Sequence, residues 1–137
     1  MAKLVLTNAY VLLNAVDLSD HVKSVTVNYT ADEVDATTMS LGSRARLGGL
    51  KDWSIDVTFA QDYALSSVDA TLFPLVGTTF AVEVRPTNGA RSTTNPAYTG
   101  TGLLSSYTPM GQAVGALNEA TVKISGANGT ALARQTA

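Results

Sequence analysis

Strict alternation of apolar and polar residues is the feature that most limits how this chain can fold. In "KDWSIDVTF", residues 51–59, every second side chain from Trp53 to Phe59 is large and apolar. This period of two places apolar side chains on one face of a strand and polar side chains on the other. The same alternation recurs in "SVTVNY", "TFAVEVR" and "EATVKIS". The chain is therefore expected to form half-buried antiparallel strands.

The strand pattern extends over most of the chain and predicts a mainly β protein. With "KLVL", "AYVLL" and "TGLLSSY" added, we expect about six to seven strands in an antiparallel β-sandwich or barrel. A length of 137 residues suits a single domain with one core, residues 1–137. The expected core residues are Trp53, Ile55, Val57, Phe59, Leu72, Phe80, Val82 and Val84.

One segment departs from this pattern and predicts a short α-helix flanking the sheet. In "DYALSSVDATLFPLVG", residues 62–77, apolar residues recur at helical spacing. Ser66 or Ser67 is expected to cap the start. Pro74 lacks an amide donor, so the helix should kink or end there, and Gly77 suits a left-handed stop. The apolar positions are Leu65, Val68, Leu72, Leu75 and Val76.

A long polar segment, "ADEVDATTMSLGSRARLGGL" (residues 31–50), interrupts the strands and predicts a long extended loop or hairpin. One interpretation is an exposed mobile loop whose charges favour solubility. The other is an inter-subunit arm whose acidic and basic groups meet opposite charges on identical neighbours, which sets register and rejects wrong packing. The candidate interface residues are Asp32, Glu33, Asp35, Arg44, Arg46 and Lys51.

The residue types that usually carry catalysis are scarce or poorly placed. The chain has no cysteine, which excludes disulfides, thiolate metal sites and a cysteine nucleophile. His21, the only histidine, is interpreted as a turn residue at a strand entrance, because zinc sites usually need several His or Cys ligands. Asp52 and Asp56 share a strand face, but about 13 Å of strand separates their Cα atoms, more than in glycosidase carboxylate pairs. We expect no enzyme activity, no catalytic residue, no metal and no cofactor.

Charge and hydropathy bear on two further classes of partner. A formal net charge of −2 and a pI of about 5.1 do not suit a surface that grips the phosphate backbone. No stretch approaches the roughly 18 apolar residues that a membrane helix needs, so no membrane partner is expected. The segment "MAKLVLTNAYVLL" lacks the apolar region and cleavage site of a signal peptide. We expect the chain to be made and retained in a cytoplasm.

Four phrases, taken in order, carry a resemblance that covers nearly the whole chain. They are "LTNAYVLLNAVDLSDHVKSVTVNYTADEVDATTM", "RARLGGLKDWSIDVTFAQDY", "SVDATLFPLVGTTFAVEVRP" and "TNPAYTGTGLLSSYTP". In this order and spacing the sequence resembles the major tail (tail tube) proteins of long-tailed, non-contractile bacteriophages, in particular those of actinobacterial hosts. The polar C-terminal tail, residues 127–137, contributes least and is expected to be loose in the isolated subunit.

The resemblance implies a structural virion protein. Tail tube proteins close into six-membered rings, and the rings stack around a channel through which the genome leaves the capsid. The segment 31–50 would be the inter-subunit and inter-ring arm. Further partners would be tape-measure, tail-tip or connector proteins and DNA in transit, and the location would be the virion tail after assembly in the bacterial host cytoplasm. The polar strand faces would line the lumen, where acidic and neutral walls let DNA slide. The lumen-facing candidates are Asp52, Asp56, Ser24, Thr26 and Asn28.

Two other interpretations remain open. Capsid decoration proteins and head-to-tail connector rings are also small, cysteine-free, β-rich and oligomeric. A carbohydrate-binding β-sandwich would instead use aromatic side chains as stacking platforms. Trp53 is in register with the apolar face of its strand, which favours a core position over a sugar-binding one. The other candidate platforms are Tyr63, Tyr98 and Tyr107.

Overall fold

The computed structural model describes residues 3–127 and 129–136. Within this part of the chain an eight-stranded antiparallel sheet dominates, and the predicted mainly β class is confirmed. The strands are β1 (Tyr10–Leu13), β2 (Val16–Asp17), β3 (Val22–Asp35), β4 (Arg46–Ala60), β5 (Thr79–Arg85), β6 (Ala97–Thr108), β7 (Glu119–Gly126) and β8 (Ala133–Gln135). The helical segments are the 3₁₀ helix η1 (Ser19–His21), the α-helix α1 (Val68–Leu72) and the 3₁₀ helix η2 (Phe73–Leu75).

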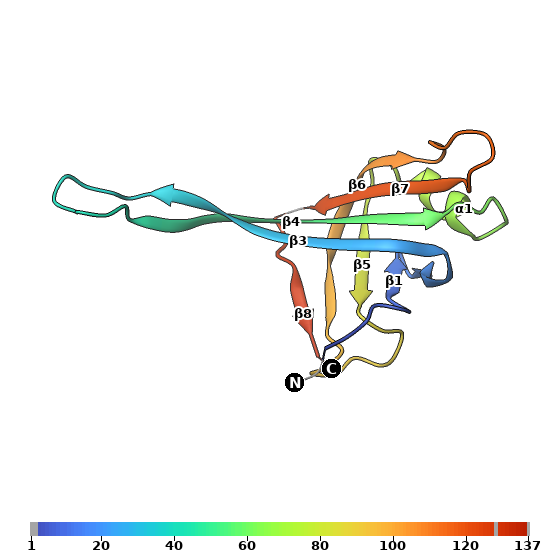
Figure 1. Ribbon diagram of the computed structural model, residues 1–137, viewed down its shortest axis with the longest axis horizontal. Coiled ribbons are helices and arrows are strands. Elements are labelled where there is room, and N and C mark those ends of the chain that lie inside the picture. Colours follow the sequence, from blue (N-terminus) through green and yellow to red (C-terminus); the bar gives the residue numbers. More distant parts are fainter. Residues whose placement is uncertain (1–2, 128, 137) are drawn as a thin grey trace.

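Strand β6 belongs to both parts of the sheet, and the sheet bends along it. The hydrogen-bonded order is β2-β1-β5-β6-β7-β4-β3, with β8 paired to β6. The first part of β6 pairs with β5 and the second part with β7, and the register shifts between Leu104 and Ser106. Such irregularities bend a strand. As a result β3, β4 and β7 run along the long axis of the molecule, whereas β1, β5 and β8 run across it (Figure 1).

The alternating apolar side chains fill the space between the two parts of the sheet. All eight residues expected in the core are buried. Val57 lies opposite Val25 on β3 and Val122 on β7, so the apolar face continues from strand to strand. Helix α1 adds Val68 and Leu72, which are both fully buried. The core therefore follows from the period-two pattern and one helical stripe.

Trp53 packs against glycines of neighbouring strands. A Cβ at Gly100 would lie 2.7 Å from Trp53 Cζ2, and a Cβ at Gly126 would lie 2.6 Å from the indole nitrogen. The indole N–H donates to the Thr130 carbonyl oxygen at 3.1 Å. The glycines thus leave the space that the indole ring occupies, and the hydrogen bond attaches the C-terminal segment to β4.

Two predicted elements differ in the structure. Residues 3–6, "KLVL", form no strand, because no neighbouring strand edge pairs with them, and Leu4, Val5 and Leu6 are exposed. The prediction of a strand there was wrong. The α-helix is also shorter than the apolar spacing predicted, since Leu65 and Val76 lie outside it and are exposed.

The ends of the helical region show why it is short. Ser67 occupies the N-cap position, but its hydroxyl donates to Asp62 Oδ2 at 2.8 Å and does not cap the helix. Pro74 lies in η2, where the chain narrows to a 3₁₀ turn. Gly77 has a φ of +81°, the left-handed conformation predicted for the stop.

The C-terminal segment 127–137 is held against the sheet in the part that the structure describes. Ala133–Gln135 form β8, which pairs with the start of β6. The Thr130 hydroxyl donates to the Thr101 carbonyl oxygen on β6 at 3.3 Å. The expected loose tail is therefore partly ordered, and residues 128 and 137 lie outside the described part. None of the described helices has the length and apolar character to cross a membrane.

The packing around the indole generates a stability prediction. Gly126→Ala should lower the free energy of unfolding by about 1–3 kcal/mol, because the added methyl group overlaps the Trp53 ring. Urea unfolding followed by the fluorescence of this single tryptophan measures the change. Gly48→Ala is the matched control, because a Cβ there meets nothing within 4 Å and should change stability by less than about 0.5 kcal/mol. Equal midpoints for the two variants would contradict the packing role.

Candidate functional site

The segment 31–50 is part of a two-stranded arm that leaves the body of the molecule. Strands β3 and β4 pair out to Asp35 and Arg46, and the arm projects along the long axis (Figure 1). Strand β4 pairs with β7 only from Ser54 onward, so beyond that point the ribbon has no third strand. An isolated two-stranded ribbon is marginally stable in water. The arm therefore has the form of an element that is completed by a partner.

The charged residues of the arm pair with each other across the ribbon. Arg44 Nη1 lies 3.3 Å from Asp35 Oδ2, and Arg46 Nε lies 3.4 Å from Glu33 Oε2. Hydrogen bonds from the Thr37 hydroxyl and the Thr37 backbone N–H hold the pKa of Asp35 below its usual value. Within this chain, four of the six candidate interface residues thus stiffen the arm.

The two remaining candidates, Asp32 and Lys51, also lie on the arm. Neither forms an ion pair among the described residues, and both side chains are exposed. A register shift between Ala31 and Glu33 separates Asp32 from the regular ladder. Of the six candidate interface residues, these two are the ones that have no oppositely charged partner within the described part of the chain.

Large apolar side chains that the charge pattern did not single out are exposed along the arm. Met39 is fully exposed, and Val34, Leu41, Leu47 and Leu50 expose between 48% and 82% of their surface. Val34 and Leu47 lie opposite each other on the ribbon, and exposed apolar side chains that gather in this way mark interaction sites in soluble proteins. These apolar residues are visible in the sequence, in "LGGL" and "TTMSL", but the prediction of an interface rested on the carboxylates and arginines.

The five lumen-facing candidates lie on one exposed face of the sheet. Thr26 stands opposite Asp56, and Asn28 stands opposite Ser54. On the other side of β4, Asp56 stands opposite Lys123 and Thr58 opposite Thr121. All five candidate side chains are exposed, whereas the opposite face of the same strands forms the core. The result is a continuous surface of hydroxyl, amide and carboxylate groups with Lys123 added.

His21 ends η1 directly before β3, at the strand entrance, and contacts two side chains. Its Nε2 lies 2.9 Å from Asp62 Oδ2 and 3.4 Å from the Ser67 hydroxyl. The pKa of Asp62 lies below its usual value because of hydrogen bonds from the Ala64 backbone N–H, the Ser67 hydroxyl and His21. A nucleophile relay needs the carboxylate and the hydroxyl on different ring nitrogens. Here both face one nitrogen, so the cluster joins η1 to the loop before α1 and is not arranged for catalysis.

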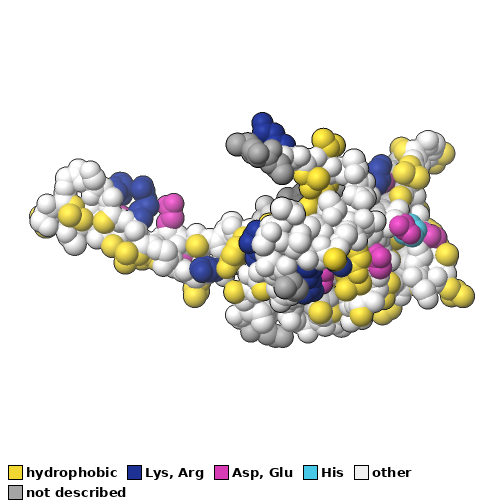
Figure 2. Space-filling view, turned by 90° about the horizontal axis from the view of Figure 1, so that it is seen from below, with side chains coloured by type: hydrophobic (Ala, Val, Ile, Leu, Met, Phe, Trp, Pro, Cys, Tyr) yellow, Lys and Arg dark blue, Asp and Glu magenta, His cyan; other side chains and the backbone are white. Residues whose placement is uncertain are grey.

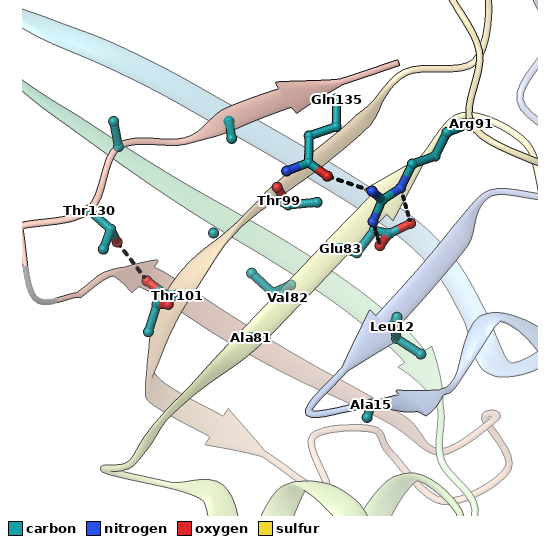
Figure 3. A pocket seen from close by; sticks show the side chains of 13 residues that line it. Leu12, Ala15, Ala81, Val82, Glu83, Arg91, Thr99, Thr101, Thr130 and Gln135 are labelled. Atoms are coloured by element: carbon teal, nitrogen blue, oxygen red, sulfur yellow. Dashed lines mark hydrogen bonds and ion pairs between the residues drawn. The ribbon is translucent and has the colours of Figure 1, made fainter. Parts of the chain in front are cut away.

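A pocket of about 530 Å³ lies over β5 and β6 beside the C-terminal segment (Figure 3). Glu83 on its wall is buried, accepts a hydrogen bond from Arg91 Nη2 at 2.5 Å, and forms an ion pair with Arg85, whose Nε lies 2.7 Å from Oε2. The Arg85 guanidinium also lies 3.9 Å from the ring centroid of Tyr10, and Arg91 Nη1 donates to Gln135 at 2.5 Å. The sequence pattern does not indicate this network, because Glu83 occupies one of the alternating polar positions in "TFAVEVR" that normally face solvent.

The pocket carries no arrangement suited to a reaction. Its carboxylate is paired with two guanidinium groups, and its other walls are formed by alanines, threonines, Gly100, Leu12, Val82 and Gln135. Among the described residues no group of three or more His, Cys, Asp or Glu side chains could hold a metal ion. The network ties β5, the following loop and β8 together and has a structural role.

The aromatic residues considered for sugar stacking differ in position. Trp53 exposes only 2% of its surface and cannot serve as a platform. The Tyr107 hydroxyl donates to Asp69 Oδ1 at 2.8 Å and accepts from Gln61 at 3.0 Å. Burial raises the pKa of Tyr107 to about 12. Tyr63 remains exposed, so the residues do not form one stacking surface.

Comparison with known proteins bears on the fold. No family model matches the sequence, and no curated protein matches it. Among solved structures, the chain is similar to one in the virion of a native gene transfer agent particle, with a TM-score of 0.69 and 14% identity over 92% of this chain and 95% of that one. It is also similar to one in the tail of an empty gene transfer agent particle, computed with helical refinement and C6 symmetry, with a TM-score of 0.65 and 17% identity. That alignment covers 82% of this chain and 81% of the other. The chain thus shares its fold with proteins of phage-like particles.

Proposed function

We propose that this chain is a structural virion protein that assembles into six-membered rings, and that the rings stack into the tail tube of a long-tailed, non-contractile phage. The observation that carries the proposal is the two-stranded arm, residues 31–50, on a fold shared with a chain in a C6-symmetric tail. The order of the sequence phrases, which resembles tail tube proteins of actinobacterial phages, supports the same assignment. In this function the chain has no catalytic role.

The arm supplies the physical reason for assembly. It is a ribbon without a third strand, and it exposes apolar side chains such as Met39 and Leu50 to water. Burying these side chains against another copy recovers their transfer free energy, about 25 cal/mol per Å². Because the arm and the body are different surfaces, the contact is head to tail, and such contacts generate closed rings or open stacks.

The polar face supplies a surface for the channel. It holds hydroxyl and amide groups with Asp52 and Asp56, and Lys123 is opposite Asp56. A wall of this composition offers no cluster of cations to hold phosphates, so DNA can pass without binding tightly. In the virion tail the remaining partners are the tape-measure protein and the tail-tip or connector proteins, and assembly takes place in the bacterial host cytoplasm.

The cross-ribbon ion pairs generate a test of the arm. The double variant Arg44→Glu and Arg46→Glu should stay folded but lose tube formation, because like charges then face each other across the ribbon. Sedimentation and size-exclusion chromatography measure assembly, and tryptophan fluorescence checks the fold. The control adds Glu33→Arg and Asp35→Arg, which restores both pairs with reversed signs and should recover tubes. Normal tubes from the double variant would overturn the role of the arm.

The polar face generates a second test, of its position in the lumen. Tubes of Asp56→Lys should retain a short labelled DNA duplex several-fold more than the unmodified tubes at ~50 mM salt, and the difference should largely vanish by ~200 mM. Asp20→Lys carries the same charge change on an exposed residue of η1, away from this face, and is the control. Equal retention by the two variants would exclude the polar face as the channel wall.

A further inference from the structure

Two surfaces with exposed apolar side chains lie at opposite ends of the long axis. Neither holds an unpaired charge, because Asp62, the one carboxylate among their residues, lies 2.9 Å from His21 Nε2. The first, the arm tip, is residues 36–43, "ATTMSLGS", which connect β3 to β4. The second, the cap, consists of residues 60–67 before α1 and residues 109–118 between β6 and β7. The arm projects from one end of the body, and both cap segments lie at the other end (Figure 1).

The cap is one surface because hydrogen bonds join its two segments. The Gln61 backbone N–H donates to the Asn118 carbonyl oxygen at 3.0 Å, and the Gln61 side chain donates to the Pro109 carbonyl oxygen at 3.0 Å. The Asn118 amide also donates to the Tyr63 hydroxyl at 3.4 Å. Five large apolar side chains stand on this surface with exposed fractions from 58% to 108%: Tyr63, Leu65, Met110, Val114 and Leu117. The space-filling view shows hydrophobic side chains gathered at this end of the molecule (Figure 2).

The arm tip has matching chemistry. Met39 is fully exposed and Leu41 is 48% exposed. Residues 36–43 contain no charged side chain, and neither do residues 109–118. The nearest charges of the arm, Asp35 and Arg44, already pair with each other. Contact between the two surfaces would therefore bury apolar area without stripping water from an unpaired charge.

We infer that the arm tip of one copy docks on the cap of a second copy in the adjacent ring. This inference rests on the proposed function and names the surface that receives the arm. A second copy is the occupant because the same chain carries both complementary surfaces. The two surfaces lie at opposite ends of one axis, so copies can be added head to tail without limit. Neither surface can meet its counterpart within one chain.

The small size of the contact explains why stacking would require completed rings. A tip of eight residues is small beside the about 20–30 residues that each partner contributes to a stable interface. A single tip-to-cap contact is therefore too weak to join two free subunits. Six contacts made together between two rings act with a high effective concentration and become strong. Free subunits stay apart, and completed rings stack.

Cysteine cross-linking tests the inference directly, because the chain has no cysteine of its own. The double variant Met39→Cys and Val114→Cys places one thiol on the arm tip and one on the cap, both at fully exposed positions. Assembled tubes are treated with a short bismaleimide, which adds one cysteine thiol to each of its two rings, and are run on a non-reducing denaturing gel. We expect a ladder of dimers, trimers and longer chains. The control variant Met39→Cys and Ala90→Cys has its second thiol on an exposed loop outside the cap and should give no ladder.

The outcomes separate the inference from the proposed function. Tubes that cross-link through residues 39 and 114 but not through residues 39 and 90 support the docking. Normal tubes without a ladder, or with equal ladders from both variants, overturn the docking and leave the tube assignment standing. A chain that forms neither rings nor tubes overturns the proposed function and the docking with it.

Discussion

The packing of one indole ring determines how the rest of this molecule is arranged. Trp53 lies on β4 opposite Tyr29 on β3, near the point where the arm leaves the body. Its ring occupies space left by glycines on β6 and β7, and its N–H binds the carbonyl oxygen of Thr130. Trp53 therefore contacts both parts of the sheet and the C-terminal segment, and it does so at the base of the arm. Because the base is rigid, the direction of a long, otherwise unsupported ribbon is defined by the core.

The two faces of the sheet have different chemistry and allow different roles. The inner face of β3, β4 and β7 is the apolar core, and the outer face of the same strands carries the exposed hydroxyl, amide and carboxylate groups. The surfaces that we propose for assembly lie apart from both faces, at the ends of the molecule, where the arm tip and the cap expose apolar side chains. A subunit built in this way can bury its ends against other copies while its polar face stays in contact with water.

Much of the fold could be predicted from the sequence because period-two alternation is a local property. The core around Ile55 and Val57 follows from it, and the buried stripe of Val68 and Leu72 follows from the helical spacing of apolar residues, which is also local. The failures have tertiary causes. "KLVL" has the composition of a strand but no edge to pair with in one chain, and β8 forms only because Trp53 and β6 hold the segment before it. The alternation predicted polar faces on two separate strands, and the pairing of β3 with β4 joins them into one face. The cap could not be foreseen, since it joins two loops separated by more than forty residues.

Negative-stain electron microscopy of the purified, concentrated protein, beside size-exclusion chromatography, tests whether this chain alone contains the surfaces for ring closure and stacking. We expect hollow tubes of uniform width, with six-fold symmetry in end views, at high concentration and a smaller species on dilution. A folded monomer that persists at every concentration would contradict it, and would favour a decoration or connector role that needs a capsid or a single ring as its template.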